Sequence, residues 1–312
     1  MFFANQNIID ILYKKTARQH YLFTKILPEQ LNLQSIDYYL LFRILDTIED
    51  SNIDVSIKIN LFNQIKSDFI NGIKEINKVL KNNKNIEENY LYIIQNIHSI
   101  LDFHFSIDKE VQKVIEQTGI LMAGGMLEYL IKYEEKKEEY FIKDFNDFER
   151  YCYFVAGIVG ELNLKLYKIN KFITQDFYDV NLQSSINLGV YLQIINIIRD
   201  FIKDKKEKKK IYFPITLKNL ELKKQLIEII KYAKEKENSI IKFINKIKEK
   251  KIKKYCDTLF RIGKIHYDFY LTKPDILEKQ SKPSAIKIFF SLPLLLKINF
   301  IKYKIEKSFA KS

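Results

Sequence analysis

Two aspartates at helical spacing lie in one apolar stretch of this chain. Residues 191–204 read YLQIINIIRDFIKD, with no glycine or proline to interrupt a helix. At about 100° per residue, Gln193, Asn196, Asp200 and Asp204 fall close to one line, which we call the Asp200 stripe. Apolar residues surround this line, so the pattern predicts a buried helix with a narrow polar edge rather than a surface helix.

A second segment repeats this design near the N-terminus. Residues 36–50 read IDYYLLFRILDTIED, in which Tyr39, Arg43, Asp46 and Asp50 follow the same helical line, here called the Asp46 stripe. Either pair of aspartates alone could be an ordinary solvated helix end. Two such pairs, each with an arginine close by and apolar flanks, favour a functional site.

Carboxylates on an apolar helix need a counter-charge, because burying an unpaired carboxylate is costly. Mg²⁺ is the expected ion, since it is held by one or two carboxylates together with substrate phosphates. Two stripes that hold several Mg²⁺ ions would suit a diphosphate substrate. A ferritin-like di-metal site is the competing interpretation, but it needs a Glu-x-x-His spacing that this sequence lacks.

Arginine is scarce in a chain that is rich in lysine. Of 52 basic residues, five are arginine, at positions 18, 43, 150, 199 and 261. Where such a chain keeps arginine, its planar, bidentate guanidinium group is expected to have a purpose. Arg43 and Arg199 lie beside the two pairs of aspartates.

Two further segments have residue types that could serve a substrate. In residues 151–160, YCYFVAGIVG, the small residues around Gly157 could line a slot for a long apolar chain, with Tyr153 at its border, or could simply pack against another helix. Lys208 to Lys210 follow Asp204 closely and could cover a bound diphosphate, or form a solvated loop. His20 is interpreted as a half-buried polar residue, and His98 and His104 as solvated or structural ones.

The fold class indicated is all-α, as a single domain over residues 1–312. Eight glycines and five prolines in 312 residues, without a Gly/Ser-rich or Pro-rich linker, favour long helices. Periodicity predicts helices over 7–30, 36–50, 54–80, 86–106 and 107–135, and two lysine-rich helices within 219–275. The apolar segment 286–301 is interrupted by Lys287, Pro293 and Lys297, so we expect a core or interfacial helix rather than a membrane span.

The formal net charge of +13 does not indicate a nucleic-acid partner, because the excess is lysine spread over solvent faces rather than arginine. A membrane-surface protein is the non-enzymatic alternative, although it leaves both stripes without a purpose. The N-terminus lacks the features of a signal peptide, and the two cysteines form no CxxC pair. We therefore expect a cytoplasmic location, with peripheral membrane contact as a variant. Nothing in the sequence sets the oligomeric state.

These motifs together resemble the squalene/phytoene synthase family, and its squalene synthase branch most of all. The resemblance rests on YYLLFRILDTIED at 38–50, YCYFVAGIVG at 151–160, and YLQIINIIRDFIKD followed by IYFP at 191–214. It implies an isoprenoid synthase bundle of helices around a central cavity. It also implies a Mg²⁺-dependent reaction of two farnesyl diphosphates.

Site roles follow from the resemblance by position. Asp46, Asp50, Asp200 and Asp204 would bind Mg²⁺ and diphosphate from facing helices, and Arg18, Arg43 and Arg199 would bind diphosphate oxygens. Tyr39, Gln193 and Asn196 would line the reaction centre, with Phe154, Gly157 and Lys210 as further substrate contacts. Tyr153 would act as the local base.

Three departures from the family pattern stand out. The family's Ser-Arg-Ser-Phe is Ala17-Arg18-Gln19-His20 here, and the acidic residue that often follows DTIED is Ser51. Phe154 replaces the tyrosine that squalene synthases place before Val-Ala-Gly, while Tyr153 stands one residue earlier.

The implied product is presqualene diphosphate and then, with NADPH, squalene. No GxGxxG motif follows a strand, so NADPH would bind without a Rossmann unit. The alternatives are a synthase of presqualene diphosphate, dehydrosqualene or phytoene that performs no reduction.

Overall fold

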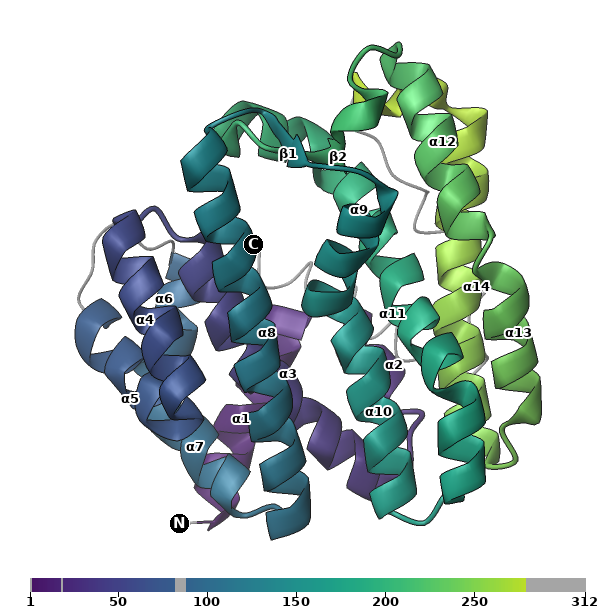
Figure 1. Cartoon of the computed structure of the whole chain (residues 1–312). Coiled ribbons are helices and arrows are strands. Elements are labelled where there is room, and N and C mark those ends of the chain that lie inside the picture. The colour runs from purple at the N-terminus through teal and green to yellow at the C-terminus, as the bar shows by residue number, and fades with distance from the viewer. Residues whose placement is uncertain (1, 18, 82–87, 279–312) are drawn as a thin grey trace, which may run out of the picture. The chain divides into compact units, whose positions relative to one another are not determined.

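The computed structural model describes residues 2–17, 19–81 and 88–278, and these are mostly helical, which confirms the all-α class (Figure 1). The chain divides into two compact units. Unit 1 comprises residues 1–21, 29–137 and 158–180, and unit 2 comprises residues 22–28, 138–157 and 181–312. The single domain and the central cavity stay predictions. The segment 286–301 lies outside the described residues.

Unit 1 is built on a long central helix, α3, whose buried positions are mainly leucine and isoleucine. Helix α8 packs against α3, α4 and α10, and α4 packs against α5. The helices of unit 1 are α1 (Phe2–Ala17), α3 (Glu29–Asp50), α4 (Val55–Ser67), α5 (Phe69–Leu80), α6 (Glu88–Gln95), α7 (Ile97–Phe105), α8 (Lys109–Lys136) and α10 (Ile158–Ile169). Helices α2 (Gln19–Thr24) and α11 (Gln175–Lys203) begin in unit 1 and end in unit 2.

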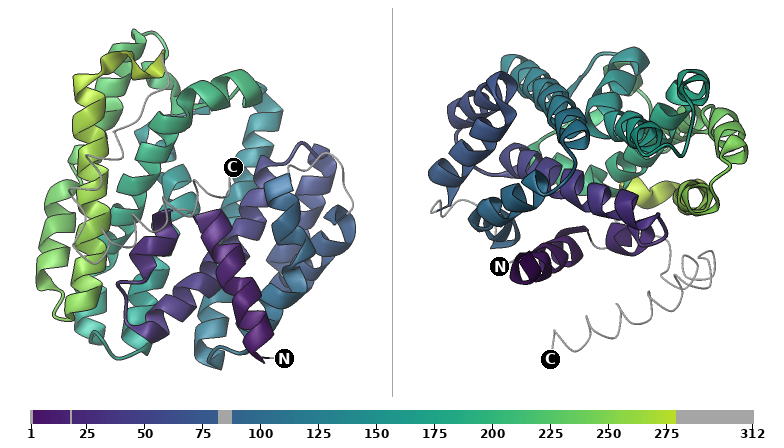
Figure 2. Two further views of the ribbon diagram at one scale, coloured as in Figure 1. Left: turned by 180° about the vertical axis from the view of Figure 1, so that it is seen from behind. Right: turned by 90° about the horizontal axis from the view of Figure 1, so that it is seen from below.

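Unit 2 combines helices with a two-stranded parallel sheet, in which Tyr140 pairs with Ile211. Helix α14 lies along α12 and α13, as seen from behind in Figure 2. The elements of unit 2 are β1 (Tyr140–Ile142), α9 (Phe145–Cys152), the π-helical turn η1 (Tyr153–Gly157), the π-helical turn η2 (Asp204–Lys208), β2 (Ile211–Pro214), the 3₁₀ turn η3 (Ile215–Leu217), α12 (Leu222–Lys234), α13 (Glu237–Lys246), α14 (Lys250–Thr272) and the 3₁₀ turn η4 (Pro274–Leu277).

Several predicted helices are shorter than expected. The segment 54–80 is two helices because Asp68 ends α4 and caps α5, its carboxylate accepting a hydrogen bond from the Asn71 amide at 2.9 Å. The segment 86–106 likewise breaks at Asn96, and 219–275 holds three helices rather than two. Within the described ranges, no helix is both long and apolar enough to cross a membrane.

Polar contacts from both sides fix helix α3 in unit 1. The Tyr38 hydroxyl donates to Asn163 of α10 at 3.0 Å. Gln34 and Asn170, the residue that follows α10, exchange two amide hydrogen bonds of 2.8 and 3.2 Å. Toward α7, Asp37 lies 2.8 Å from the Nδ1 of His104. These contacts set the rotation of α3, and therefore the direction in which its acidic stripe faces.

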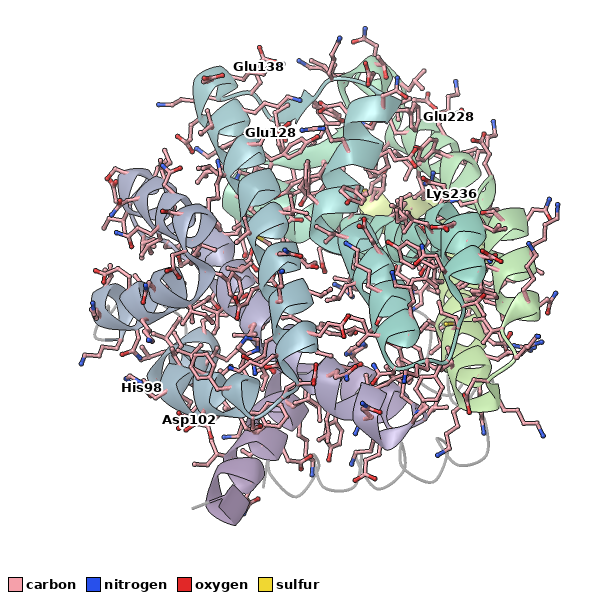
Figure 3. All side chains as sticks on the ribbon, turned by 60° about the horizontal axis from the view of Figure 1, so that its bottom comes forward. His98, Asp102, Glu128, Glu138, Glu228 and Lys236 are labelled. Carbon is pink, nitrogen blue, oxygen red and sulfur yellow. The ribbon has the colours of Figure 1, made fainter. Side chains whose placement is uncertain are left out.

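The histidines of α7 are of the two kinds that the sequence suggested. His98 is exposed on the same side of the helix as Asp102 (Figure 3). His104 is fully buried between the carboxylates of Asp37 and Glu116, at 2.8 and 3.1 Å. His104 is therefore a structural residue that joins α3, α7 and α8.

We expect Gly189→Ala to destabilise unit 2 by about 1–3 kcal/mol, since an inserted methyl group overpacks the contact between α11 and η1. A Cβ at Gly189 would lie 2.4 Å from the carbonyl oxygen of Ala156 and 2.9 Å from the Cα of Gly157, both backbone atoms. Urea unfolding would measure the change. The matched control is Gly124→Ala in α8, where a Cβ would lie 3.9 Å from the nearest atom, on Lys66. This variant should stabilise the folded chain by up to about 1 kcal/mol, because alanine favours a helix more than glycine does. Equal midpoints for both variants would contradict the close packing.

Candidate functional site

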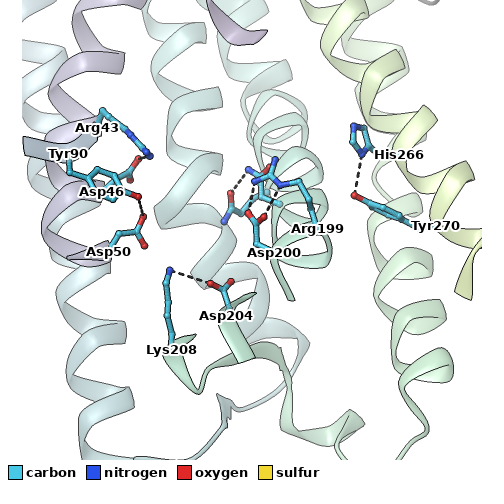
Figure 4. Close-up of polar contacts among 12 residues, drawn as sticks. Arg43, Asp46, Asp50, Tyr90, Arg199, Asp200, Asp204, Lys208, His266 and Tyr270 are labelled. Carbon is cyan, nitrogen blue, oxygen red and sulfur yellow. Dashed lines mark hydrogen bonds and ion pairs between the residues drawn. The ribbon is translucent and has the colours of Figure 1, made fainter. Parts of the chain in front are cut away.

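The Asp46 stripe lies on the C-terminal half of α3 and is joined by a tyrosine from α6 (Figure 4). Arg43 Nη1 lies 3.2 Å from Asp46 Oδ2, with 27% and 33% of the two side chains exposed. The Tyr90 hydroxyl donates to Asp50 Oδ2 at 3.1 Å. The guanidinium carbon of Arg43 lies 5.1 Å from the centre of the Tyr90 ring. The stripe is thus a connected set of groups on a partly open face of the helix.

Arg43 stays cationic in this setting. Burial by itself would lower the pKa of Arg43, but the negative charge of Asp46 more than reverses this, and the pKa is raised. The Nε atom of Arg43 is buried and has no hydrogen-bond partner. An arginine with an unused donor beside two carboxylates can donate a hydrogen bond to a phosphate oxygen.

Tyr39, the N-terminal member of the Asp46 stripe, lies in an aromatic cluster. The His20 ring stacks on Tyr39 at 5.5 Å, and Tyr13 meets Tyr39 edge-on at 5.1 Å. His20 is half-buried, as expected, and burial lowers its pKa to about 4, so it is neutral near pH 7. Arg18, the remaining phosphate-binding candidate of this region, lies outside the described residues.

Three members of the Asp200 stripe, Gln193, Asn196 and Asp200, lie on the C-terminal half of α11, within unit 2. Gln193 accepts a hydrogen bond from the Asn196 amide at 3.2 Å, one turn before Asp200. The Asp200 carboxylate binds the guanidinium of Arg199 through both oxygens, with the Nε to Oδ1 distance at 2.9 Å. Burial would lower the pKa of Arg199, but the hydrogen bonds and charge of Asp200 raise it overall.

Asp204 departs from the predicted helical line, because α11 ends at Lys203 and Asp204 begins the π-helical turn η2. Its side chain is 13% exposed and pairs with Lys208 Nζ at 3.2 Å. The turn closes where the Lys210 amide donates to the Asp204 carbonyl at 3.1 Å, with Lys209 at a positive φ of 54°. Turns of this kind are frequent at functional sites.

A pair on α14 that the sequence did not indicate also belongs to the surroundings of the Asp200 stripe. His266 Nδ1 lies 3.2 Å from the Tyr270 hydroxyl (Figure 4). Burial, together with the positive charge of Arg199, lowers the pKa of His266 to about 4. Burial raises the pKa of Tyr270, so both groups are neutral near pH 7. No local sequence pattern indicates the pair of His266 and Tyr270, because Arg199, whose charge acts on His266, lies more than sixty residues away in the sequence.

The candidate base lies in the other π-helical turn, η1. Tyr153 and Phe154 are half-buried, with ring centres 5.5 Å apart, and Arg150 lies over the Phe154 ring at 4.9 Å. Gly157 is buried, and a Cβ there would lie 3.1 Å from a methyl group of Val190. Gly157 therefore contacts α11, and its predicted contact with a substrate stays a prediction.

The donor chemistry of both stripes fits Mg²⁺. Across the described ranges, no group of three or more histidine, cysteine, aspartate or glutamate side chains could hold a metal ion. Each stripe offers two carboxylates, which suits Mg²⁺ when phosphate oxygens and water complete its coordination.

Comparison with known proteins decides the family. Residues 13–221 match the family model for squalene/phytoene synthase, a range that includes both acidic stripes and η1. This chain belongs to the squalene/phytoene synthase family. The family resemblance is thereby confirmed.

Relatives of this squalene/phytoene synthase family member include fungal squalene synthases. The chain is 28% identical to that of Eremothecium gossypii over 194 residues, which are 62% of this chain and 42% of the relative. It is 32% identical to that of Saccharomyces cerevisiae over 183 residues, 57% of this chain and 38% of the relative. The aligned part thus spans less than half the length of these relatives.

The fold of this family member is similar to solved synthases. The structure of TcSQS with the ligand BPH1237 matches with a TM-score of 0.77 at 17% identity, covering 97% of this chain and 91% of TcSQS. This similarity confirms the isoprenoid synthase fold that the motifs implied.

Proposed function

We propose that this chain is a Mg²⁺-dependent prenyltransferase that joins two molecules of farnesyl diphosphate head to head. The observation that supports this most is the pair of aspartate stripes inside the family match, each already bonded to an arginine. Each stripe carries negative charge that a bound divalent cation would neutralise in place of the arginine. The arginines are then available to a diphosphate.

The first step breaks the bond between C1 and oxygen of one farnesyl diphosphate, and the diphosphate leaves with the electron pair. The residues that would hold Mg²⁺ are Asp46, Asp50, Asp200 and Asp204, and the charge of the ion would stabilise the leaving diphosphate. Arg43 and Arg199 would turn from Asp46 and Asp200 toward phosphate oxygens, because arginine binds phosphate in the same two-pronged manner as carboxylate. Arg18 and Lys210 are assigned to the same diphosphate contacts.

The allylic cation is then attacked by the double bond of the second farnesyl diphosphate, and a proton leaves to give presqualene diphosphate. We assign the proton transfer to Tyr153, whose hydroxyl accepts the proton and passes its own to the released diphosphate. Tyr39, Gln193 and Asn196 are assigned to the lining of the reaction centre, and Phe154 and Gly157 to the prenyl chain. Phe154 has no group that accepts a proton, so it does not replace Tyr153 in this role.

The second half of the proposal is reductive. Presqualene diphosphate loses its diphosphate, rearranges and accepts a hydride from NADPH, giving squalene and NADP⁺. The five lysines among residues 205–210, a segment that also contains Glu207, would supply the positive charge that NADPH phosphates require. Lys205 is paired with Glu139 at 3.9 Å and Lys208 with Asp204 at 3.2 Å. A synthase that stops at presqualene diphosphate, or forms an unreduced product, is the alternative.

The products of farnesyl diphosphate and Mg²⁺ test both halves. We expect presqualene diphosphate to accumulate without NADPH and to be converted to squalene when NADPH is added, as measured by gas chromatography after dephosphorylation. Geranylgeranyl diphosphate in a parallel reaction tests the chain length. If the product profile is the same with and without NADPH, the squalene assignment fails and the unreduced alternative holds.

A further inference from the structure

Tyr90 on α6 contacts two members of the Asp46 stripe at once. Its hydroxyl donates to Asp50 Oδ2 at 3.1 Å, and the guanidinium of Arg43 lies over its ring at 5.1 Å. Arg43 in turn binds Asp46 at 3.2 Å. Tyr90 therefore closes a chain of contacts that runs Asp46, Arg43, Tyr90, Asp50 (Figure 4).

Asp50 needs support from outside its own helix. It is the last residue of α3, where the helix dipole is negative and disfavours a carboxylate. From α4, Lys58 donates to the Glu49 carbonyl at 2.7 Å and fixes the backbone of this helix end. The Tyr90 hydroxyl adds a donor to the Asp50 side chain itself. It restricts the directions in which the Asp50 oxygens point.

Arg43 also depends on Tyr90. Its Nη1 is held by Asp46, while its Nε is buried without a hydrogen-bond partner. The face of the Tyr90 ring fixes the plane of the guanidinium group, because a cation is attracted to the electron-rich face of an aromatic ring. A leucine of similar bulk at position 90 could do neither task.

We propose that Tyr90 is a positioning residue for the Asp46 stripe: its hydroxyl orients the Asp50 carboxylate for a divalent cation, and its ring holds Arg43 ready for a diphosphate. This inference rests on the proposed function. It assigns the two tasks to two separate parts of one side chain, so the two can be separated by substitution.

Tyr90→Phe removes the hydroxyl and keeps the ring. We expect it to weaken the binding of Mn²⁺, used as a paramagnetic probe with inorganic diphosphate, by about 10- to 100-fold, the usual effect of removing a group that orients a metal ligand. The KM for farnesyl diphosphate at saturating metal should stay unchanged. Tyr90→Leu removes the ring as well and should also raise that KM. Tyr92→Phe is the matched control, because Tyr92 lies on the same helix and contacts Lys15 instead, at 4.3 Å.

A double-mutant cycle tests whether Tyr90 affects metal binding through Asp50 rather than through the folding of the chain. If Tyr90 acts through Asp50, the variant Tyr90→Phe with Asp50→Asn should bind Mn²⁺ no more weakly than Asp50→Asn alone. The inference is overturned if Tyr90→Phe weakens Mn²⁺ binding by the same factor in the unaltered chain and in the Asp50→Asn variant. It is also overturned if Tyr90→Phe binds Mn²⁺ as tightly as the unaltered chain. In both cases the proposed function still stands. If the unaltered chain neither binds Mn²⁺ with diphosphate nor releases diphosphate from farnesyl diphosphate, the proposed function itself fails, and the inference with it.

Discussion

Asp46→Asn and Asp200→Asn are each expected to reduce Mg²⁺-dependent diphosphate release to background, a loss of at least about a thousandfold. An amide has nearly the shape of a carboxylate but no charge, so it binds a divalent cation far more weakly and forms no ion pair with the neighbouring arginine. The variants should keep the helix content and melting temperature of the unaltered chain. Asp46 and Asp50 are like charges one turn apart, and removing that repulsion offsets the lost contact with Arg43.

Diphosphate release from farnesyl diphosphate, circular dichroism and thermal melting test this together. Asp102→Asn and Asp257→Asn are matched controls, since they place the same substitution on partly or fully exposed helical positions outside the stripes; Asp257 even keeps an arginine partner, Arg261, at 2.7 Å. Both controls should retain full activity. Substantial activity in Asp46→Asn or Asp200→Asn would remove the metal site from the proposal.

The stripes could be predicted because helical periodicity is a local property of the sequence. Tyr39, Arg43, Asp46 and Asp50 lie on α3, and Gln193, Asn196 and Asp200 lie on α11, as the spacing indicated. The same spacing predicts Asp204 on this helix, which is wrong, because the backbone changes to a π-helical turn at that residue. Nothing in the hydrophobic pattern distinguishes such a turn from a continuing helix.

Helix ends and strands were harder to predict. The apolar pattern continues through Asp68, so the break between α4 and α5 depends on one capping side chain rather than on a change of period. Strands β1 and β2 have three and four residues, too few to show an alternation, and they pair across about seventy positions. The sequence pattern therefore predicts neither strand.

Partners from distant helices were not predictable at all. Tyr90 contacts Asp50 from forty residues away, and Asp37 contacts His104 from 67 residues away. Asp37 sits at an inward position of α3 where a leucine would be the ordinary choice. A lone acidic residue on the apolar face of a helix was the available signal, and it points to a buried partner without naming it.

His104→Ala is expected to destabilise unit 1 by about 3–5 kcal/mol, the usual cost of removing one partner from a buried charged pair. Asp37 would then be fully buried with neither oxygen bonded to histidine; its Oδ1 already lacks a hydrogen-bond partner. Burial by itself would lower the pKa of His104, but the carboxylates of Asp37 and Glu116 raise it overall. Burial raises the pKa of Asp37.

The raised pKa values of His104 and Asp37 both make the folded chain less stable as the pH rises. A group whose pKa is higher in the folded than in the unfolded chain contributes fully below the unfolded value, and this contribution is lost as the pH rises through the folded value. The contribution of His104 to the free energy of unfolding should therefore be complete below about pH 6.5, the ordinary pKa of histidine, and should fall as the pH rises above it. The contribution of Asp37 begins to fall earlier, above its unfolded pKa of 3.8, so the free energy of unfolding should decrease throughout the range above about pH 6.5. Urea unfolding at several pH values from 6 to 9 would measure this, and His104→Ala should flatten the profile.

A double variant separates the pair from the packing around it. Replacing a buried ion pair by apolar residues of similar size is often neutral or stabilising. Asp37→Leu with His104→Leu should therefore recover most of the stability that His104→Ala loses, since Glu116, with 31% of its side chain exposed, can be solvated instead. The double variant should also lose the fall in stability above pH 6.5. If the double variant is as unstable as His104→Ala, or keeps the pH dependence, the pair of Asp37 and His104 is not the source of the stability loss or of the pH dependence.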